Sequence, residues 1–157
     1  MTSKTQLQSK IQELEEELKT FKEQLNNYKE ITIETAVPGD VLEDGSIVLK
    51  KENGLALLVA PESTEVVCPW SKAFPEVFEK LKEQGFNPSQ WFVPTKEQLQ
   101  LAYLSISNHF DAANYWSSTE VSSTNACVKD FRYGGVDGIN KTCSFRVRAF
   151  RCVTYLT

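Results

Sequence analysis

Hydrophobic residues recur along the first thirty positions in alternating steps of four and three, which is the heptad pattern of a coiled coil. The members of this seam are Leu7, Ile11, Leu14, Leu18, Phe21, Leu25 and Tyr28. No glycine or proline precedes Pro38, so a single helix of about 26 residues is expected. A stripe of two positions in seven is narrower than a helix needs when it folds onto its own domain. The pattern favours self-association of parallel helices, with an amphipathic helix packed on its own chain as the alternative.

Charged residues beside the seam agree with a parallel arrangement. Lys10 of one chain would face Glu15 of its neighbour, and Glu17 would face Lys22, so both pairings attract when parallel chains are in register. The seam between residues 11 and 25 holds no polar residue that would specify a dimer. The seam therefore does not force a dimer, and of the two states we prefer a homotrimer, with a dimer as the alternative.

Turn-forming residues separate this helix from the remainder of the chain. Because Pro38-Gly39 is typical of a turn, residues 31–38 are expected to be a linker after a stalk formed by residues 1–30. Two apolar runs follow, at 46–49 and 55–60, and the residues between them end in Asn-Gly. This arrangement predicts a β-hairpin whose loop is longer than two residues.

Two helices and a series of short strands are expected within residues 39–157. Apolar residues at helical spacing between 74 and 81 predict the first helix, and Thr95 with Gln98 forms a capping box that begins the second. From residue 114 onward short strands alternate with polar loops. The run 142–153 alternates at first, with 143, 145, 147 and 149 on one face, and is compatible with one continuous strand. The sequence therefore predicts an α+β domain that follows an N-terminal helix.

Charge and hydropathy narrow the classes of function. The 157 residues include 17 basic and 21 acidic side chains, and the net charge of −4 argues against a dedicated nucleic-acid-binding protein. The apolar runs are too short to cross a bilayer, so no membrane insertion is expected. Residues 1–10 are polar and lead into no apolar stretch, so we expect no secretory signal.

No catalytic group of residues stands out, and we expect neither enzyme activity nor a cofactor. The single histidine, His109, has no cysteine near it at metal-ligand spacing, and Ser117 lacks the sequence context of a nucleophile. Asp130, Asp137 and Asn140 offer oxygen ligands for calcium, but their spacing matches no known calcium loop, so no metal site is expected.

The cysteines are expected to be free thiols, because disulfides form in oxidising compartments and no export signal is present. They are Cys68, Cys127, Cys143 and Cys152. On one continuous strand, Cys143 and Cys152 would lie about 30 Å apart and could not bridge. A disulfide between Cys127 and Cys143 on neighbouring strands stays open as an alternative.

Four segments in a fixed order carry a resemblance to a known family. They are residues 45–49 with 54–60, Trp91-Phe92-Val93-Pro94-Thr95-Lys96-Glu97-Gln98-Leu99, Tyr115-Trp116-Ser117-Ser118-Thr119-Glu120 and Val147-Arg148-Ala149-Phe150-Arg151. Over residues 39–152 the chain resembles the C-terminal-domain family of the Legionella collagen-like adhesin. The resemblance implies a C-type-lectin-like fold, which receptor-binding proteins of phages with diversity-generating systems share.

Motif positions in this resemblance imply structural roles for a set of residues. The set is Trp91, Pro94, Glu97, Trp116, Glu120, Arg146 and Arg148. We expect the two tryptophans to be core anchors, with exposed sugar-stacking platforms as the alternative. We expect the two arginines to pair with Glu97 or Glu120 because an unpaired buried guanidinium is costly, with an anion site as the alternative.

Loops between strands are the expected recognition surface of such a fold. These loops are 105–114, 121–125 and 133–141. The ligand-binding candidates are Arg132, Tyr133, Asn140 and Lys141. An aromatic face suits a sugar ring, and the basic side chains suit an anionic glycan. The alternative is a solvated turn whose charges bind nothing.

These expectations together predict a trimeric attachment module in a phage virion, either a fibre or a receptor-binding protein. A virion protein assembles in the host cytoplasm and needs no export signal. The expected partners are further copies of this chain, virion proteins bound through the N-terminal region, and a cell-surface glycan or protein of the host. The alternative is a structural fibre or cap component that binds other virion proteins rather than a receptor.

Overall fold

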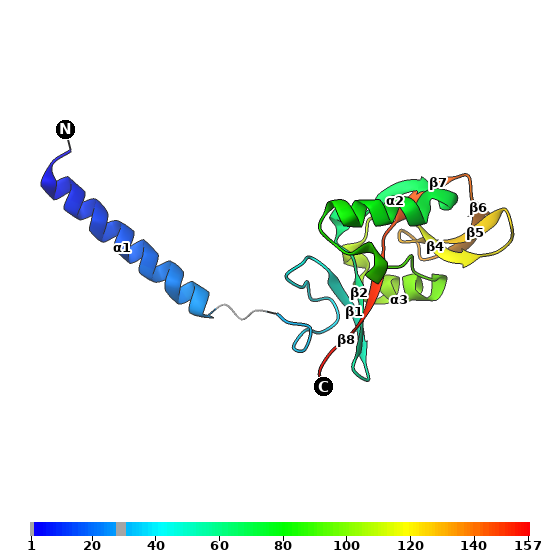
Figure 1. Ribbon diagram of the computed structural model, residues 1–157, viewed down its shortest axis with the longest axis horizontal. Helices are drawn as coiled ribbons and strands as arrows, with labels where there is room; N and C mark the ends of the chain where they lie inside the picture. The colour runs from blue at the N-terminus through cyan, green and yellow to red at the C-terminus, as the bar shows by residue number, and fades with distance from the viewer. Residues whose placement is uncertain (1, 28–30) are drawn as a thin grey trace. The chain divides into compact units, whose positions relative to one another are not determined.

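The computed structural model describes residues 2–27 and 31–157, and the chain divides into two units between residues 30 and 31. The first unit is one helix, α1 (Lys4–Asn27), drawn in blue in Figure 1. Ser3 begins this helix with a capping box: its hydroxyl accepts from the backbone N–H of Gln6, and the Gln6 side chain accepts from the N–H of Ser3. With 24 residues, α1 is about 36 Å long at 1.5 Å per residue.

The second unit contains two β-sheets, and its mixed α+β class agrees with the sequence expectation. The smaller sheet has the order β1-β2-β8 and is antiparallel, with β1 (Ile47–Glu52), β2 (Leu55–Val59) and β8 (Phe150–Thr154). The larger sheet has the order β3-β7-β4-β5-β6, with β3 (Val66–Pro69), β4 (Asn114–Glu120), β5 (Asn125–Asp130), β6 (Val136–Asn140) and β7 (Ser144–Val147). Within it β4 and β7 run parallel, and the other pairs are antiparallel.

Two α-helices cover these sheets (Figure 1). Helix α2 (Trp70–Glu83) packs on β3 and β7, and it begins four residues before the stretch that the apolar spacing predicted. Helix α3 (Lys96–Ile106) contacts β1 of the smaller sheet and β4 and β5 of the larger one. Short 3-10 helices occupy Glu62–Thr64, Pro88–Gln90 and Ser107–His109.

The capping box predicted at the start of α3 is confirmed. The Thr95 hydroxyl accepts from the backbone N–H of Gln98 at 3.2 Å, and the Gln98 side chain accepts from the N–H of Thr95 at 2.9 Å. The buried face of the helix is formed by Leu99, Ala102 and Ile106. Two hydrogen bonds within one turn therefore fix where the helix begins, and its apolar face joins the two sheets.

The β1–β2 hairpin is tighter than the sequence suggested, and the longer loop predicted there is wrong. Asn53 and Gly54 alone form the turn, with φ values of 52° and 78°, and both residues of a type I′ turn adopt this left-handed region. Residues 50–52 continue β1 after a register shift between Val48 and Lys50. Charged side chains do not prevent pairing on this edge strand, because the ladder is made by the backbone.

The C-terminal run 142–153 is not one strand. β7 ends at Val147, and β8 begins at Phe150 in the other sheet. Ala149 lies in the crossing and its carbonyl accepts from the N–H of Ala60 at 2.9 Å. The alternation ends at this crossing, because the adjacent residues Ala149 and Phe150 are both buried.

Residues 31–38, expected to be a linker, belong to the second unit. Ala36 is buried against side chains of β1 and β2. The Lys51 ammonium donates to the carbonyls of Glu34 and Ala36 at 3.1 and 2.9 Å. The segment is held mainly through its backbone, which explains why its side-chain pattern gave no sign of this packing.

All four cysteines are free, and they fall into a buried and an exposed pair. Cys68 and Cys127 are buried, whereas Cys143 and Cys152 are exposed. Burial raises the pKa of the Cys68 thiol to about 12, which suppresses the reactive thiolate. We expect dithionitrobenzoate near neutral pH to titrate two thiols rapidly in the folded protein and four in guanidinium chloride. Rapid reaction of all four in the folded state would contradict this burial.

Candidate functional site

One side of α1 carries a continuous stripe of exposed hydrophobic side chains. Their exposed fractions run from 50% at Leu14 to 71% at Leu25. The described members are Leu7, Ile11, Leu14, Leu18, Phe21 and Leu25. Tyr28, the last member of the predicted seam, lies outside the described residues. A narrow apolar stripe of this kind is the surface that one helix presents to another.

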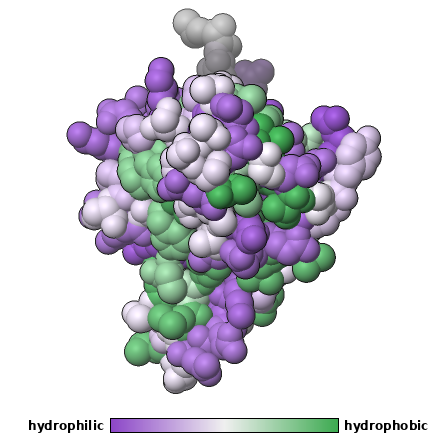
Figure 2. All heavy atoms as spheres, turned by 90° about the vertical axis from the view of Figure 1, so that its right-hand side faces the viewer, coloured by the Kyte–Doolittle hydropathy of each residue, from purple (hydrophilic) through white to green (hydrophobic). Residues whose placement is uncertain are grey.

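The four side chains predicted to bind ligand do not form one site. Tyr133 lies in the turn before β6 and is 81% exposed, whereas Lys141 follows β6. The five residues of this strand place the two ends about 17 Å apart. Arg132 donates to the carbonyl of Ala112 at 3.2 Å. Figure 2 shows the molecule from the right-hand side of Figure 1, the side of β4, β5 and β6. Hydrophobic side chains lie there in separate groups among hydrophilic ones.

Lys141 and Asn140 hold the connection between β6 and β7. The Lys141 ammonium lies 2.9 Å from the Glu120 carboxylate and 4.4 Å from the centre of the Trp70 ring. The side-chain carbonyl of Asn140 accepts from the N–H and the hydroxyl of Thr142 at 2.9 and 2.7 Å. These polar groups are engaged within the protein, so Tyr133 alone of the predicted set stands free of side-chain partners among the described residues.

The turn that presents Tyr133 is anchored by a buried lysine that the sequence did not single out. Lys129 is fully buried, and its ammonium donates to the side chain of Gln100 and to the carbonyl of Gly134. It lies 4.5 Å from the centre of the Tyr103 ring, and burial lowers its pKa. The sequence of β5 gave no signal for this contact, because Gln100 lies in a helix 29 positions earlier.

The two motif tryptophans lie in the core, with exposed fractions of 4% for Trp91 and 0% for Trp116. The Trp116 indole donates to the carbonyl of Cys68 at 3.0 Å. Trp91 packs edge-on against Phe86, with 5.5 Å between ring centres. Pro94 is buried as well, and its carbonyl accepts from a β4 N–H at 2.8 Å. These residues support the fold, and none of them offers a face to a ligand.

Arg146 and Arg148 pair with Glu65, so the expected pairing with Glu97 or Glu120 is wrong. The Arg146 guanidinium lies 3.2 Å from one oxygen of Glu65, and the Arg148 guanidinium lies 3.4 Å from the other. The side chains of Arg148 and Glu65 are 1% and 6% exposed. Glu97 is exposed in the first turn of α3, and Glu120 is bound to a lysine, so neither is available.

This ion cluster joins three segments of the second unit. The Tyr115 hydroxyl donates to Glu65 at 2.6 Å and accepts from the N–H of Asp111 at 3.1 Å. The Asp111 carboxylate lies 2.9 Å from Arg146. Burial raises the pKa of the Glu65 carboxyl, although Tyr115 and the two guanidinium groups act in the opposite direction. Burial also raises the pKa of Tyr115, as does its hydrogen bond to Glu65. The cluster is a structural cross-link that fixes the loop before β4.

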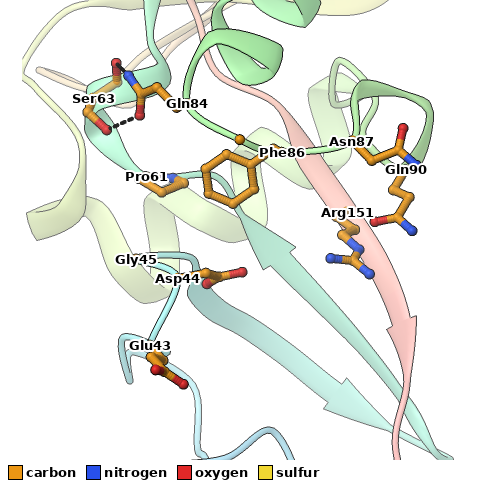
Figure 3. A pocket seen from close by; sticks show the side chains of 11 residues that line it. Glu43, Asp44, Gly45, Pro61, Ser63, Gln84, Phe86, Asn87, Gln90 and Arg151 are labelled. Atoms are coloured by element: carbon orange, nitrogen blue, oxygen red, sulfur yellow. Dashed lines mark hydrogen bonds between the residues drawn. The ribbon is translucent and has the colours of Figure 1, made fainter.

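A groove of about 710 Å³ opens on another part of the second unit, between segments far apart in the sequence. Phe86 and Pro61 lie in its middle in Figure 3. On one side of them lie the side chains of Asn87, Gln90 and Arg151, and on the other side lie those of Glu43 and Asp44. Polar donors and acceptors therefore surround an apolar centre, with the carboxylates and the guanidinium coming from different segments.

Local hydrogen bonds make the walls of this groove rigid. One oxygen of Asp44 accepts from the N–H and the hydroxyl of Ser46 at 2.9 and 2.5 Å. Gln84 and Ser63 exchange two hydrogen bonds of 2.7 Å, drawn as dashed lines in Figure 3. The side chain of Asn87 accepts from the N–H of Ser89 at 3.2 Å at the start of a 3-10 helix. Each wall therefore keeps its shape without a ligand.

Arg151 extends into the groove from β8. Its guanidinium carbon lies 5.8 Å from the centre of the Trp91 ring, an arrangement that favours a cation over an aromatic face. The residue is half-buried, and among the described residues it has no ion-pair or hydrogen-bond partner for its side chain. Arg151 ends the fourth motif segment, but it was not among the predicted binding residues, because most of the other groove residues come from turns outside the four segments.

The fold and the surfaces above define a class: an α+β domain with a polar groove, preceded by a helix with an exposed apolar stripe. Comparison with protein-family models and with curated proteins finds no match for this chain. Within residues 2–27 and 31–157, no three His, Cys, Asp or Glu side chains are grouped as a metal ion requires. No helix in those ranges combines the length and the apolar character needed to cross a bilayer.

Proposed function

We propose that this protein is a non-enzymatic attachment protein in which a parallel coiled coil of three chains carries three C-type-lectin-like domains. The observation that carries the proposal is the stripe on α1, where six hydrophobic side chains are at least half exposed. Water contact with so many apolar groups is unfavourable, and a second and third helix would remove it. The charge pairs Lys10–Glu15 and Glu17–Lys22 favour a parallel register.

The arrangement of residues 31–157 supports the lectin-like part of the proposal. Strands and both α-helices form a rigid base, and irregular connections between strands are exposed at its edges. The motif residues Trp91, Trp116 and Arg148 are buried, which agrees with a family whose shared motif is structural. Recognition then falls to positions at the surface, where loops and grooves differ between proteins.

Several heads on one stalk suit attachment to a repetitive surface. A single weak site gains apparent affinity by about 10²–10⁴ when several copies bind together. We place the protein in a bacteriophage virion, as a fibre or receptor-binding protein that binds other virion proteins through its N-terminal region. Its ligand in this proposal is a glycan or protein on the host cell surface.

Binding to cells tests this function. Fluorescently labelled full-length protein and its Leu18→Asp variant are mixed with a panel of bacterial strains, and bound protein is measured by flow cytometry. We expect wild type to bind a subset of strains and the variant to bind at least about tenfold less at equal chain concentration, because avidity is lost.

Two results would count against attachment. Binding of wild type to none of the strains would contradict a receptor-binding role. Immunogold labelling of this chain at an internal joint of virions would instead support a structural component that binds other virion proteins.

A further inference from the structure

We propose that the groove between Phe86 and Arg151 binds a neutral, hydroxyl-rich sugar residue. The inference rests on the proposed attachment function, since it names the ligand class and its place on the head. The volume of about 710 Å³ lies within the range of small-molecule sites, which is roughly 300–1,000 Å³. Because the walls are fixed by internal hydrogen bonds, a ligand meets a site that is already formed.

Opposite charges are held apart across the groove. Arg151 and Asp44 both line the groove beside Phe86, and they form no ion pair with each other. Here β8 fixes one residue and the turn at Gly45, with φ +88°, fixes the other. The separation leaves a guanidinium and a carboxylate available to a group placed between them.

Hydroxyl groups are the ligand chemistry that satisfies both sides together. A sugar hydroxyl can donate to the second oxygen of Asp44, and a neighbouring one can accept from Arg151 or the Gln90 amide. The ring of Phe86 and the side chain of Pro61 offer apolar surface for the C–H face of the sugar ring. An apolar centre flanked by donors and acceptors therefore matches a polyhydroxylated ring.

The net charge of the groove favours the binding of neutral over anionic sugars. One guanidinium, from Arg151, stands against two carboxylates, from Glu43 and Asp44, so the groove has an excess of one negative charge. A sulfated or uronic chain would be repelled by this excess. The prediction thus differs from the anionic glycan that the basic residues of loop 133–141 suggested.

Saturation-transfer NMR on the full-length protein tests the site. The probes are the methyl glycosides of glucose, galactose, mannose and N-acetylglucosamine, with methyl glucuronide as the anionic comparison and a lysine-rich hexapeptide as a non-sugar probe. We expect transfer to at least one neutral glycoside and weaker transfer to the glucuronide. Arg151→Gln should lower affinity for that glycoside about tenfold, the effect of one charge-assisted hydrogen bond.

Two further variants keep the result interpretable. The Gln90 side chain is exposed and makes no hydrogen bond to the described residues, so Gln90→Ala should leave the melting temperature at the wild-type value. It should weaken sugar binding, because it removes an amide that lines the groove. Arg132→Gln makes the same chemical change as Arg151→Gln at a site away from the groove, and it should leave affinity unaltered.

The proposal is overturned by any of three results. These are no transfer to any neutral glycoside, equal affinity in wild type and Arg151→Gln, or binding in the groove of the glucuronide or the peptide alone. The cell-binding experiment reports separately on the proposed function. Cell binding that survives Arg151→Gln and Gln90→Ala would contradict sugar recognition by the groove and support attachment. Sugar binding in the groove without cell binding would support the site and contradict attachment.

Discussion

Replacing Leu18 with aspartate is expected to convert the proposed trimer into monomers whose second unit remains folded. Leu18 lies in the middle of the α1 stripe and is 53% exposed in the single chain, so in a coiled coil it faces the other helices. Three carboxylates buried there would have no partner, and each uncompensated charge costs about 3–5 kcal/mol. Sedimentation velocity measures the assembly, and near-UV circular dichroism reports on the second unit.

A matched variant distinguishes the effect of a charge in the seam from the effect of a charge elsewhere on α1. Thr20→Asp adds the same carboxylate two residues further on, where the side chain is exposed and outside the heptad seam. We expect this variant to sediment as wild type does. A Leu18→Asp protein with unchanged sedimentation would show that α1 does not control assembly.

Glu65→Gln is expected to destabilise the second unit far more than the loss of an exposed carboxylate would. The substitution leaves the guanidinium of Arg148, 1% exposed, without its counter-charge. Breaking a buried ion pair from one side costs about 3–5 kcal/mol. Urea unfolding followed by tryptophan fluorescence would measure the loss, since two of the three tryptophans are buried in this unit.

Two comparisons make this result specific. Glu97→Gln removes a carboxylate that is exposed at the start of α3, so it should cost less than about 1 kcal/mol. The double variant Glu65→Leu, Arg148→Met removes both charges and should recover part of the stability, because apolar replacement of a whole buried pair is often neutral. Equal losses for Glu65→Gln and Glu97→Gln would contradict the assigned pairing.

Features that depend on neighbours in the sequence were predictable. Thr95 and Gln98 are three residues apart, and their capping box fixes the start of α3 where expected. Asn53-Gly54 predicted a hairpin, but the length of its loop was misjudged because the polarity of residues 50–52 hid a strand. Local chemistry identifies turns and helix ends, whereas side-chain polarity locates the ends of an edge strand poorly.

Features that depend on distant residues were not predictable. Glu65 and Arg148 are 83 positions apart, and Glu65 lies outside every motif that drew attention to the arginines. The crossing at Ala149 places β7 and β8 in different sheets, and the residues around it do not indicate which sheet β8 joins. The groove gathers side chains from several turns, so no single stretch of sequence carries its signature. Such contacts depend on how distant segments pack together, and a single sequence does not reveal which segments pack together.

The packing of Ala36 governs how this protein should be attached to a surface for experiments. Ala36 shares a buried cluster with β1 and β2, and Val153 and Tyr155 near the C-terminus pack against that cluster. The first residues of the second unit and its C-terminal residues therefore lie side by side. An affinity tag or a biotin at the C-terminus would anchor the domain beside the point where the chain enters it. Figure 1 shows the C-terminus apart from β4, β5 and β6, so a domain immobilised in this way keeps these strands away from the support.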